Sequence, residues 1–564
     1  MLAACLASAA TAAVPELRGT WVTTTGLSAG TVRTPAATAA NFGRLRAIGL
    51  NTVYMDAWRN GYTYYKSDAI KAITGRELAP ELGTRDLFGE TLIQSHRNGM
   101  SQFAWLQYGF ATQFLDTPSA TTNPLSTHMK NRGWLLKDAA GAYTNSTNKF
   151  AWMNPLVPEV RELVIRMGVE LVRKYDLDGI QFDDRLAWPT QFGYDEVTRS
   201  TYLSETGRAL PTDPRDAAFV KWRSEKVTDF AKQFSTALRA ANPRVRVAAA
   251  PGGYGNTYAT YAVDAPTWSR TSVEVNGVTS PLFDEITPQI YSSLPNNFAG
   301  VWDQNLAALN PATRGSYSVG ISINNSAGAP YDWATINKPQ VDKSRATTGT
   351  AGHVWWYSAG VLEADEAQLT AYYDVATNGY ADRPDRPAGW RPAPVVATAA
   401  TSGKWTVTLA EPAERYQVIA RTGDAWSVVL NTVLPSGAIT LTTGGTYAAV
   451  ELLVDRRGFI KGDLNFDNRV NFEDLVALAQ NYNASGKLWT QGDFTLDGIV
   501  NFADLVVLAQ HYGTGVAPGT QPSFAAALAM VPEPTSAALV MAAAMVMGRG
   551  NKNPLPRERG RGFA

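Results

Sequence analysis

Short hydrophobic runs alternate with amphipathic stretches from residue 16 to residue 382. The runs are rich in β-branched and aromatic residues, and the stretches between them place apolar residues at helical spacing. Eight strands are predicted, at residues 18–24, 51–58, 101–107, within 175–189, and at 244–251, 283–291, 316–323 and 352–358. Helices are predicted at residues 36–48, 86–98, 158–174 and 219–241. This alternation predicts an α/β fold, a (β/α)8 TIM-type barrel over residues 16–382.

The fourth predicted strand ends in two adjacent carboxylates. Residues 175–189 read YDLDGIQFDDRLAWP, in which Asp183 and Asp184 follow a short apolar run. Side chains alternate along a strand, so Gln181 and Asp183 share the predicted lumen face while Asp184 points to the opposite face. Active sites of such barrels lie at the carboxyl ends of the strands. The alternative is a pair of solvated carboxylates that cap the next helix.

Cleavage of a glycosidic bond requires two carboxyl groups. Asp183 and Asp184 are the candidate catalytic residues, but neighbouring positions on one strand do not make a pair by themselves. The second carboxyl is therefore left open between Asp184, Asp56, Asp284 and Glu285.

Aromatic and polar residues near the predicted strand ends are candidates for substrate binding. Some of the aromatic rings are expected to stack on sugar faces, although core packing is an equal alternative for each ring taken alone. Arg59 directly follows the second strand and is suited to hold a carboxylate or sugar hydroxyls. The full set is Trp21, Arg59, Trp105, Asn154, Trp188, Gln289, Tyr291 and Trp356.

Composition narrows the class of partner and the cellular location. The 50 basic and 50 acidic residues cancel, which gives no indication of nucleic acid as a partner. The single cysteine, Cys5, excludes an internal disulfide, and the four histidines form no cluster with zinc spacing, so no catalytic cofactor is expected. Residues 1–13 are small and apolar and are predicted to be the remnant of a signal peptide, with a lipoprotein processing site at Cys5 as an alternative. The protein is therefore expected to be exported, to the extracellular space or the cell envelope.

Several motifs across residues 17–360 resemble a glycosyl-hydrolase-like family with a (β/α)8 barrel. In chain order they are TWVTTTG, NTVYMDAWRNG, SHRNGMSQFAWLQ, WMNP, DGIQFDD, KWR and DEITPQIY. The resemblance implies a glycoside hydrolase of a polysaccharide or of peptidoglycan glycan, with the DGIQFDD strand in the active site. The family often has His and Tyr where this chain has Gln181 and Arg185. These departures leave a second function open, that of a non-catalytic carbohydrate-binding component.

Beyond residue 382 the pattern changes twice. Prolines at 384, 387, 392 and 394 predict a stiff linker. Residues 396–456 then contain short alternating strands separated by Gly, Pro and Asn turns, which predict a small β-sandwich.

A repeat with a period of 30 residues occupies residues 460–515, and each copy is predicted to be a loop followed by a helix. Oxygen ligands fall at positions 1, 3, 5, 9 and 12 of a twelve-residue loop, with a main-chain carbonyl at position 7, as Ca²⁺ requires. The repeat resembles the type I dockerin module, which implies a helical calcium-loop module and a cohesin-like protein partner. The two ligand sets are Asp463, Asn465, Asp467, Arg469, Asn471 and Asp474, and Asp493, Asp497, Ile499, Asn501 and Asp504, with Thr495 a weaker ligand in the second set.

The last part of the chain, residues 531–561, combines Val-Pro-Glu-Pro, an apolar run at 537–547 and a basic end. It resembles a PEP-CTERM sorting signal, which implies transient membrane contact and cleavage near Pro532–Pro534. At 1.5 Å per residue the apolar run spans about 16 Å, short of the roughly 30 Å of a bilayer core. A disordered tail is the alternative.

Overall fold

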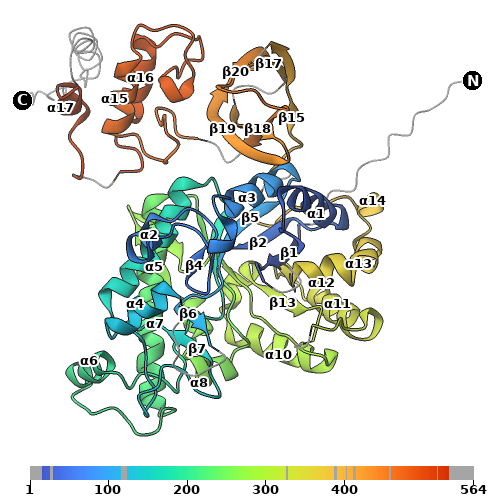
Figure 1. The fold of residues 1–564 in the computed structure, drawn as a ribbon, viewed down its shortest axis with the longest axis vertical. Coiled ribbons are helices and arrows are strands. Elements are labelled where there is room, and N and C mark those ends of the chain that lie inside the picture. Colours follow the sequence, from blue (N-terminus) through green and yellow to red (C-terminus); the bar gives the residue numbers. More distant parts are fainter. Residues whose placement is uncertain are drawn as a thin grey trace, which may run out of the picture. The chain divides into compact units, whose positions relative to one another are not determined.

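Eight parallel strands form a ring, with helices around it (Figure 1). Neighbouring strands are hydrogen-bonded in the order β12-β9-β8-β5-β2-β1-β14-β13, and bridges Ile286–Tyr317 and Gln289–Gly320 join the two ends of this sheet. All eight predicted strands are present in chain order, which fits a TIM-type barrel. They are β1 (Leu17–Val22), β2 (Thr52–Asp56), β5 (Ser101–Leu106), β8 (Gly179–Phe182), β9 (Arg246–Ala249), β12 (Glu285–Ile286), β13 (Ser318–Ser322) and β14 (Gly352–Trp356).

This computed structural model describes residues 15–25, 30–115, 123–325, 328–386, 390–401, 403–410, 414–455, 459–516 and 519–531. The chain divides into two compact units. The first comprises Met1–Val407, Val418–Val429 and Thr440–Val454, and the second Thr408–Gln417, Leu430–Ile439 and Asp455–Ala564. The predicted signal-peptide remnant at 1–13 and the sorting tail beyond Val531 lie outside the described residues. None of the helices within the described ranges is long and apolar enough to cross a membrane.

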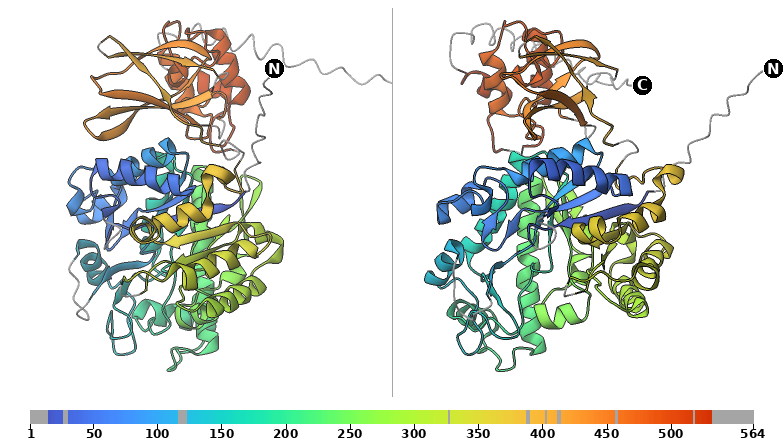
Figure 2. Two further views of the ribbon diagram at one scale, coloured as in Figure 1. Left: turned by 90° about the vertical axis from the view of Figure 1, so that its right-hand side faces the viewer. Right: turned by 45° about the vertical axis from the view of Figure 1, so that its right-hand side comes forward.

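Helices surround the strands, and the longest of them, α7, is green in Figure 2. The four predicted helices are found as α1 (Pro35–Ile48), α3 (Leu87–Arg97), α5 (Pro158–Lys174) and α7 (Ala217–Ala241). Helix α1 starts where Thr34 accepts a hydrogen bond from the main chain of Ala37 and Pro35 occupies the first turn. Further helices include α6 (Glu196–Thr206), α10 (Pro295–Ala308), α11 (Lys338–Ala346) and α13 (Glu366–Tyr373).

The alternation predicted for the fourth strand is observed in β8. Phe182 packs outward on Phe234 of α7, with ring centroids 4.6 Å apart. Gln181 points inward and accepts a hydrogen bond from the indole nitrogen of Trp21 at 2.8 Å. The two faces of β8 therefore separate an apolar layer under the helices from a polar face in the lumen.

Aromatic side chains fill the middle of the lumen. Trp21, Tyr54, Phe103 and Trp105 are buried there in one cluster. The size of Phe103 requires a small residue on the adjacent strand β8, because a Cβ at Gly179 would lie 2.3 Å from the Phe103 ring. The glycine that begins β8 is thus explained by close packing, and little space for polar chemistry remains below the carboxyl ends of the strands.

The amino end of the barrel holds a buried ion pair. Arg383 reaches into the lumen from the segment that follows the last barrel helix and donates to Glu285 at 2.8 Å, to Thr52 at 3.0 Å and to Asp385 at 2.9 Å. Tyr54 donates to the other carboxylate oxygen of Glu285. The side chains of Arg383 and Glu285 are only 3% and 2% exposed, so Glu285 depends on Arg383 for compensation of its charge, whereas Arg383 also pairs with Asp385.

Strands occupy the region predicted as a β-sandwich. They form a four-stranded sheet in the order β15-β21-β18-β19 and a three-stranded sheet in the order β16-β17-β20. Their bounds are β15 (Val395–Val396), β16 (Thr398–Thr401), β17 (Lys404–Leu409), β18 (Glu414–Thr422), β19 (Ala425–Leu434), β20 (Gly437–Thr442) and β21 (Ala449–Asp455).

The two copies of the repeat are interlocked. Each forms a loop and a helix, α15 (Phe472–Gln480) and α16 (Phe502–His511). Val470 of the first loop pairs by main-chain hydrogen bonds with the segment after α16, and Val500 of the second loop pairs with the segment after α15. Leu478 and Leu508 share one buried core. The two copies therefore share main-chain hydrogen bonds and one hydrophobic core.

Replacing Arg383 with methionine should destabilise the barrel by about 3–5 kcal/mol, because Glu285 is left charged and buried without its partner. The measurement is denaturant unfolding followed by tryptophan fluorescence. The Arg208→Met variant, in which an exposed arginine is replaced, is the matched control. The double variant Arg383→Met/Glu285→Gln should recover part of the loss, and a single variant as stable as the control would contradict the role of the pair.

Candidate active site

Asp183 lies just past the end of β8, and both of its carboxylate oxygens accept hydrogen bonds. Gln289 donates to one oxygen, and Arg185 donates to the other at 2.9 Å. The Gln289 amide is itself oriented by a bond to the main-chain oxygen of Ala250 at 2.7 Å. Burial raises the pKa of Asp183 and the carboxylate of Asp184 adds to this rise, whereas Arg185 and Gln289 act in the opposite direction. The site thus contains a buried carboxylate with two N–H donors.

Asp184 does not point away from Asp183 as the strand alternation predicts. One nitrogen of Arg185, Nη1, lies 2.9 Å from a carboxylate oxygen of each aspartate. The prediction is wrong because β8 ends at Phe182 and the following residues form a turn, where the two-residue period no longer applies. Asp184 is also more open than Asp183, with a side chain 43% exposed against 4%.

Asp56 ends strand β2 and is completely buried. Its Oδ2 accepts hydrogen bonds from the main chain and the hydroxyl of Thr24, at 3.3 and 2.9 Å. Its Oδ1 has no hydrogen-bond partner in the part of the chain that the structure describes. Burial raises the pKa of Asp56 to about 7, although the positive charge of Arg59 opposes the rise. A carboxyl group that is half protonated near neutral pH is suited to general acid catalysis.

The other two candidates for the second carboxyl have structural partners. Asp284 binds Arg239 at 2.8 Å and the main chain of Val247 at 2.8 Å. Glu285 belongs to the ion pair with Arg383 at the amino end of the barrel. The remaining candidates are Asp184, which shares Arg185 with Asp183, and Asp56, whose pKa the charge of Arg185 lowers.

Three of the predicted substrate-binding residues form one side of the site. Tyr291 and Trp356 stack with ring centroids 5.9 Å apart, and Gln289 holds Asp183. Tyr291 is 40% exposed and offers an open ring face. Trp21 and Trp105 lie deeper in the lumen cluster and are fully buried, so their rings fill the core beneath the site.

Two predicted residues lie apart from this group. Asn154 is buried and donates to Asp195 at 2.9 Å and to Thr198 at 3.1 Å, at the start of α6. Trp188 packs on Trp222 of α7 and is fully buried. Both contacts are those of structural residues.

Another set of residues beside Asp183 includes the predicted Arg59 and three aromatic residues that the strand pattern does not identify. We call Arg59, Tyr108, Phe114, Phe150 and Arg185 the aromatic–basic wall. Phe114 and Phe150 come from the antiparallel strands β6 (Ala111–Phe114) and β7 (Phe150–Trp152), which lie inside the long loop after β5. The alternating ATQF segment was the available signal, but it is too short to distinguish from loop.

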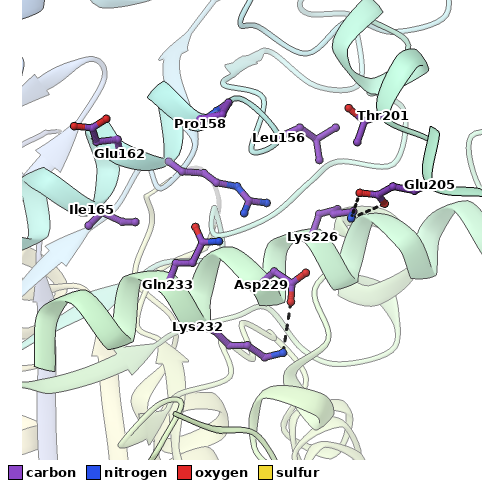
Figure 3. Close-up of a pocket in the computed structure, with 11 residues that line it drawn as sticks. Leu156, Pro158, Glu162, Ile165, Thr201, Glu205, Lys226, Asp229, Lys232 and Gln233 are labelled. Atoms are coloured by element: carbon purple, nitrogen blue, oxygen red, sulfur yellow. Dashed lines mark hydrogen bonds and ion pairs between the residues drawn. The ribbon is translucent and has the colours of Figure 1, made fainter. Parts of the chain in front are cut away.

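A groove of about 740 Å³ lies elsewhere, between helices α5, α6 and α7 (Figure 3). Its charged residues pair with one another, as in the ion pairs of Lys226 with Glu205 at 2.6 Å and of Lys232 with Asp229 at 3.5 Å. None of the predicted site residues lines it.

The predicted calcium ligands lie in two loops with the same backbone form. Phe466 and Asn468 of the first loop and Leu496 and Gly498 of the second have positive φ at positions 4 and 6. Asp474 and Asp504 occupy position 12, and each forms a capping box with the residue that begins its helix.

The first loop buries carboxylates close together. Burial and the charges of Asp474 and Asp467 raise the pKa of Asp463 to about 7, and Oδ1 of Asp463 has no partner among the described residues. A cation would relieve this repulsion. However, no three His, Cys, Asp or Glu side chains in the described ranges gather in a metal-binding arrangement. Calcium binding would thus depend on the amide and carbonyl oxygens of the loops as well as on carboxylates.

A protein-family model matches most of the barrel. The model of the family described as glycosyl hydrolase-like 10 matches residues 16–323, more than half of the chain. The chain belongs to this family. Its membership supports a glycoside hydrolase-like function, and the matched region contains Asp56, Asp183, Asp184 and Gln289.

The named proteins that the chain resembles in sequence are distant from it. The chain is 27% identical to "Glycosyl hydrolase YngK" of Bacillus subtilis (strain 168) over 173 residues, which cover 29% of this chain and 31% of that protein. It is 23% identical to "Glycosyl hydrolase DigH" of Escherichia coli (strain K12) over 265 residues, which cover 44% of this chain and 56% of that protein. The chain thus matches less than two thirds of the length of either relative.

Solved structures resemble the chain only loosely. The glycoside hydrolase domain of PgaB (BpsB) from Bordetella bronchiseptica gives a TM-score of 0.45 at 14% identity, with coverage of 63% of this chain and 98% of that domain. The catalytic domain of a β-amylase from Paenibacillus polymyxa gives 0.45 at 10% identity, with coverage of 65% and 100%. Similarity at this level carries no argument about activity.

The raised pKa of Asp56 predicts a pH effect on stability. Folded Asp56 holds its proton up to pH about 7, whereas the unfolded chain loses it near pH 4, so the free energy of unfolding should fall as pH rises from 4 to 7. The Asp56→Asn variant has no carboxyl to titrate at this position. Between these limits, the free energy of unfolding of the wild type should therefore fall by up to about 4 kcal/mol relative to that of the variant. Denaturant unfolding of both proteins at pH 4.5 and 7.5 tests it. Parallel pH profiles would show that Asp56 has an ordinary pKa.

Proposed function

We propose that the protein is an exported or cell-envelope glycoside hydrolase that cleaves O-glycosidic bonds of a polysaccharide or of peptidoglycan glycan, with acid/base chemistry centred on Asp183. The observation that supports it best is the position of Asp183. This carboxylate lies at the mouth of the barrel of a glycosyl hydrolase-like family, between Tyr291 on one side and the aromatic–basic wall on the other. Open aromatic faces beside a carboxylate suit a sugar substrate.

The environments of the carboxyl groups suggest different roles. Burial and Asp184 raise the pKa of Asp183, but its two N–H donors favour the ionised form, which a nucleophile or a base that activates water requires. Asp56 has an oxygen without a partner among the described residues and a pKa of about 7, which suits the acid that protonates the leaving oxygen. Asp184, half-exposed on Arg185, is the alternative acid.

A non-catalytic carbohydrate-binding function is the second candidate. Arg185 occupies the position where the family often has Tyr, and it binds both Asp183 and Asp184. If this cation stays in place when glycan is bound, the carboxylate is blocked and only recognition remains.

Replacing Asp183 with asparagine should abolish hydrolysis, with a loss of at least about 100-fold in kcat, while glycan binding and folding are retained. The test is reducing-end release from a panel of bacterial, plant and algal polysaccharides and from peptidoglycan glycan. The Asp303→Asn variant changes an exposed aspartate paired with Lys343 and serves as the control. Equal turnover by Asp183→Asn and wild type would remove Asp183 from catalysis, and binding without hydrolysis of any substrate would favour the second candidate.

We further propose that the repeat at 460–515 binds Ca²⁺ through the two ligand sets and docks onto a cohesin-like protein partner. The support is the repeated backbone form of the two loops and the crowded carboxylates of the first. Export, and transient membrane contact through the tail at 531–561, remain part of the proposal and follow from the sequence alone.

Removal of calcium should unfold the repeat and leave the barrel folded, because the clustered carboxylates repel one another without the ion. Differential scanning calorimetry of the full chain should show a transition that moves to lower temperature with chelator and a second that does not. A chain ending at residue 456 should lack the calcium-dependent transition. Superimposable scans with calcium and with chelator would contradict calcium binding.

A further inference from the structure

We infer that the glycan recognised by this site is acidic, and that Arg59 binds an anionic substituent of the sugar next to the cleavage point. The inference rests on the proposed function and names the class of its substrate. It comes from the aromatic–basic wall, whose five residues form one continuous set of contacts beside Asp183.

The contacts of the wall run from Arg59 to the catalytic carboxylate. The Arg59 guanidinium lies 5.7 Å from the Tyr108 ring centroid, and that of Arg185 lies 5.5 Å from the same ring. Arg185 also lies 4.5 Å from the Phe150 ring and binds Asp183 at 2.9 Å. Asn60, next to Arg59, accepts a hydrogen bond from the main chain of Phe114 at 3.2 Å. The wall is therefore a single surface that begins at the reacting carboxylate.

The wall has a flat ring and an uncompensated positive charge. Phe114 is 43% exposed, so its ring is available for a sugar face. Arg185 is neutralised by two aspartates, but Arg59 has no ion pair among the residues that the structure describes. The charge of Arg59 acts on the buried carboxyl of Asp56, whose pKa of about 7 leaves it uncharged in about half of the molecules near pH 7. Arg59 is half-buried, and a cation in that setting gains from an anionic ligand.

The net positive charge of the loop that contains β6 and β7 also favours an acidic ligand. The chain as a whole is neutral, yet residues 107–157, which include both strands of the hairpin, contain Lys130, Arg132, Lys137 and Lys149 against Asp116 and Asp138. Lys149 lies 5.7 Å from the Phe114 ring centroid. Positive charge is thus concentrated on the element that supplies the aromatic rings of the wall, which favours a polymer with repeated negative groups.

Two kinds of sugar carry such groups, those with carboxylates and those with sulfate esters. A planar guanidinium binds either through paired N–H donors. The test uses matched polymers. A uronate-containing polysaccharide is compared with the same polymer after chemical reduction of its carboxylates to alcohols, and a sulfated polysaccharide is compared with its desulfated form.

Wild-type protein should prefer the acidic member of one pair by about tenfold or more in kcat/KM, the size expected of one charge-assisted hydrogen bond. The Arg59→Gln variant should lose this preference, so that the ratio of acidic to neutral polymer approaches one, whatever its effect on the overall rate. The preference should also weaken at high salt. The Arg208→Gln variant, which removes an exposed arginine outside the site, should keep the wild-type ratio.

The outcomes separate this inference from the proposed function. Hydrolysis of both members of each pair at equal rates, or an unchanged ratio in Arg59→Gln, would overturn the acidic substrate and leave the hydrolase in place. If no polymer is cleaved, affinity electrophoresis measures whether the protein binds the acidic and neutral members of the same pairs. Retardation of wild type but not Arg59→Gln by an acidic polymer would support the inference, and equal retardation by neutral polymers would overturn it.

Discussion

The barrel depends on the charge pair between Arg383 and Glu285 at its amino end. Both side chains are buried, and the hydrogen bonds of Arg383 to Thr52 and Asp385 tie the segment after the last barrel helix to the first residue of β2 and to its own chain. A buried pair of this kind adds little to stability compared with apolar packing, but either charge alone is costly. The ion pair therefore fills the lumen at the amino ends of the strands, and aromatic rings fill its middle. The polar groups of the candidate site lie at the carboxyl ends of the strands.

The arginine after β8 sets the character of the site. Because the strand ends at Phe182, Asp183, Asp184 and Arg185 turn together, and one guanidinium nitrogen holds both carboxylates. This arrangement keeps a carboxylate in a buried place without full solvation. It also places a cation against Phe150 and Tyr108, so the candidate catalytic carboxylate and the aromatic–basic wall share a side chain.

The sequence predicted the structure best where a segment has a clear hydrophobic period of its own. All eight barrel strands and helices α1, α3, α5 and α7 were predictable because each has a clear period and, in α1, a cap at Thr34. The alternation along β8 correctly separated Gln181 from Phe182, but it could not predict the position of Asp184, since alternation stops where the strand stops at Phe182. The hairpin that carries Phe114 and Phe150, and the pairing of Glu285 with an arginine 98 residues away, depend on tertiary contacts that no local pattern contains.

The distance between Glu285 and Arg383 along the chain has a consequence for biosynthesis. A ribosome that adds about 5–20 residues per second needs roughly 5–20 s to make the 98 residues that separate them. During that interval β13 and β14 are also still being made, and Glu285 is without its arginine. Until residue 383 has been made, Glu285 lacks its ion-pair partner, so the amino end of the barrel reaches its native contacts only late in synthesis.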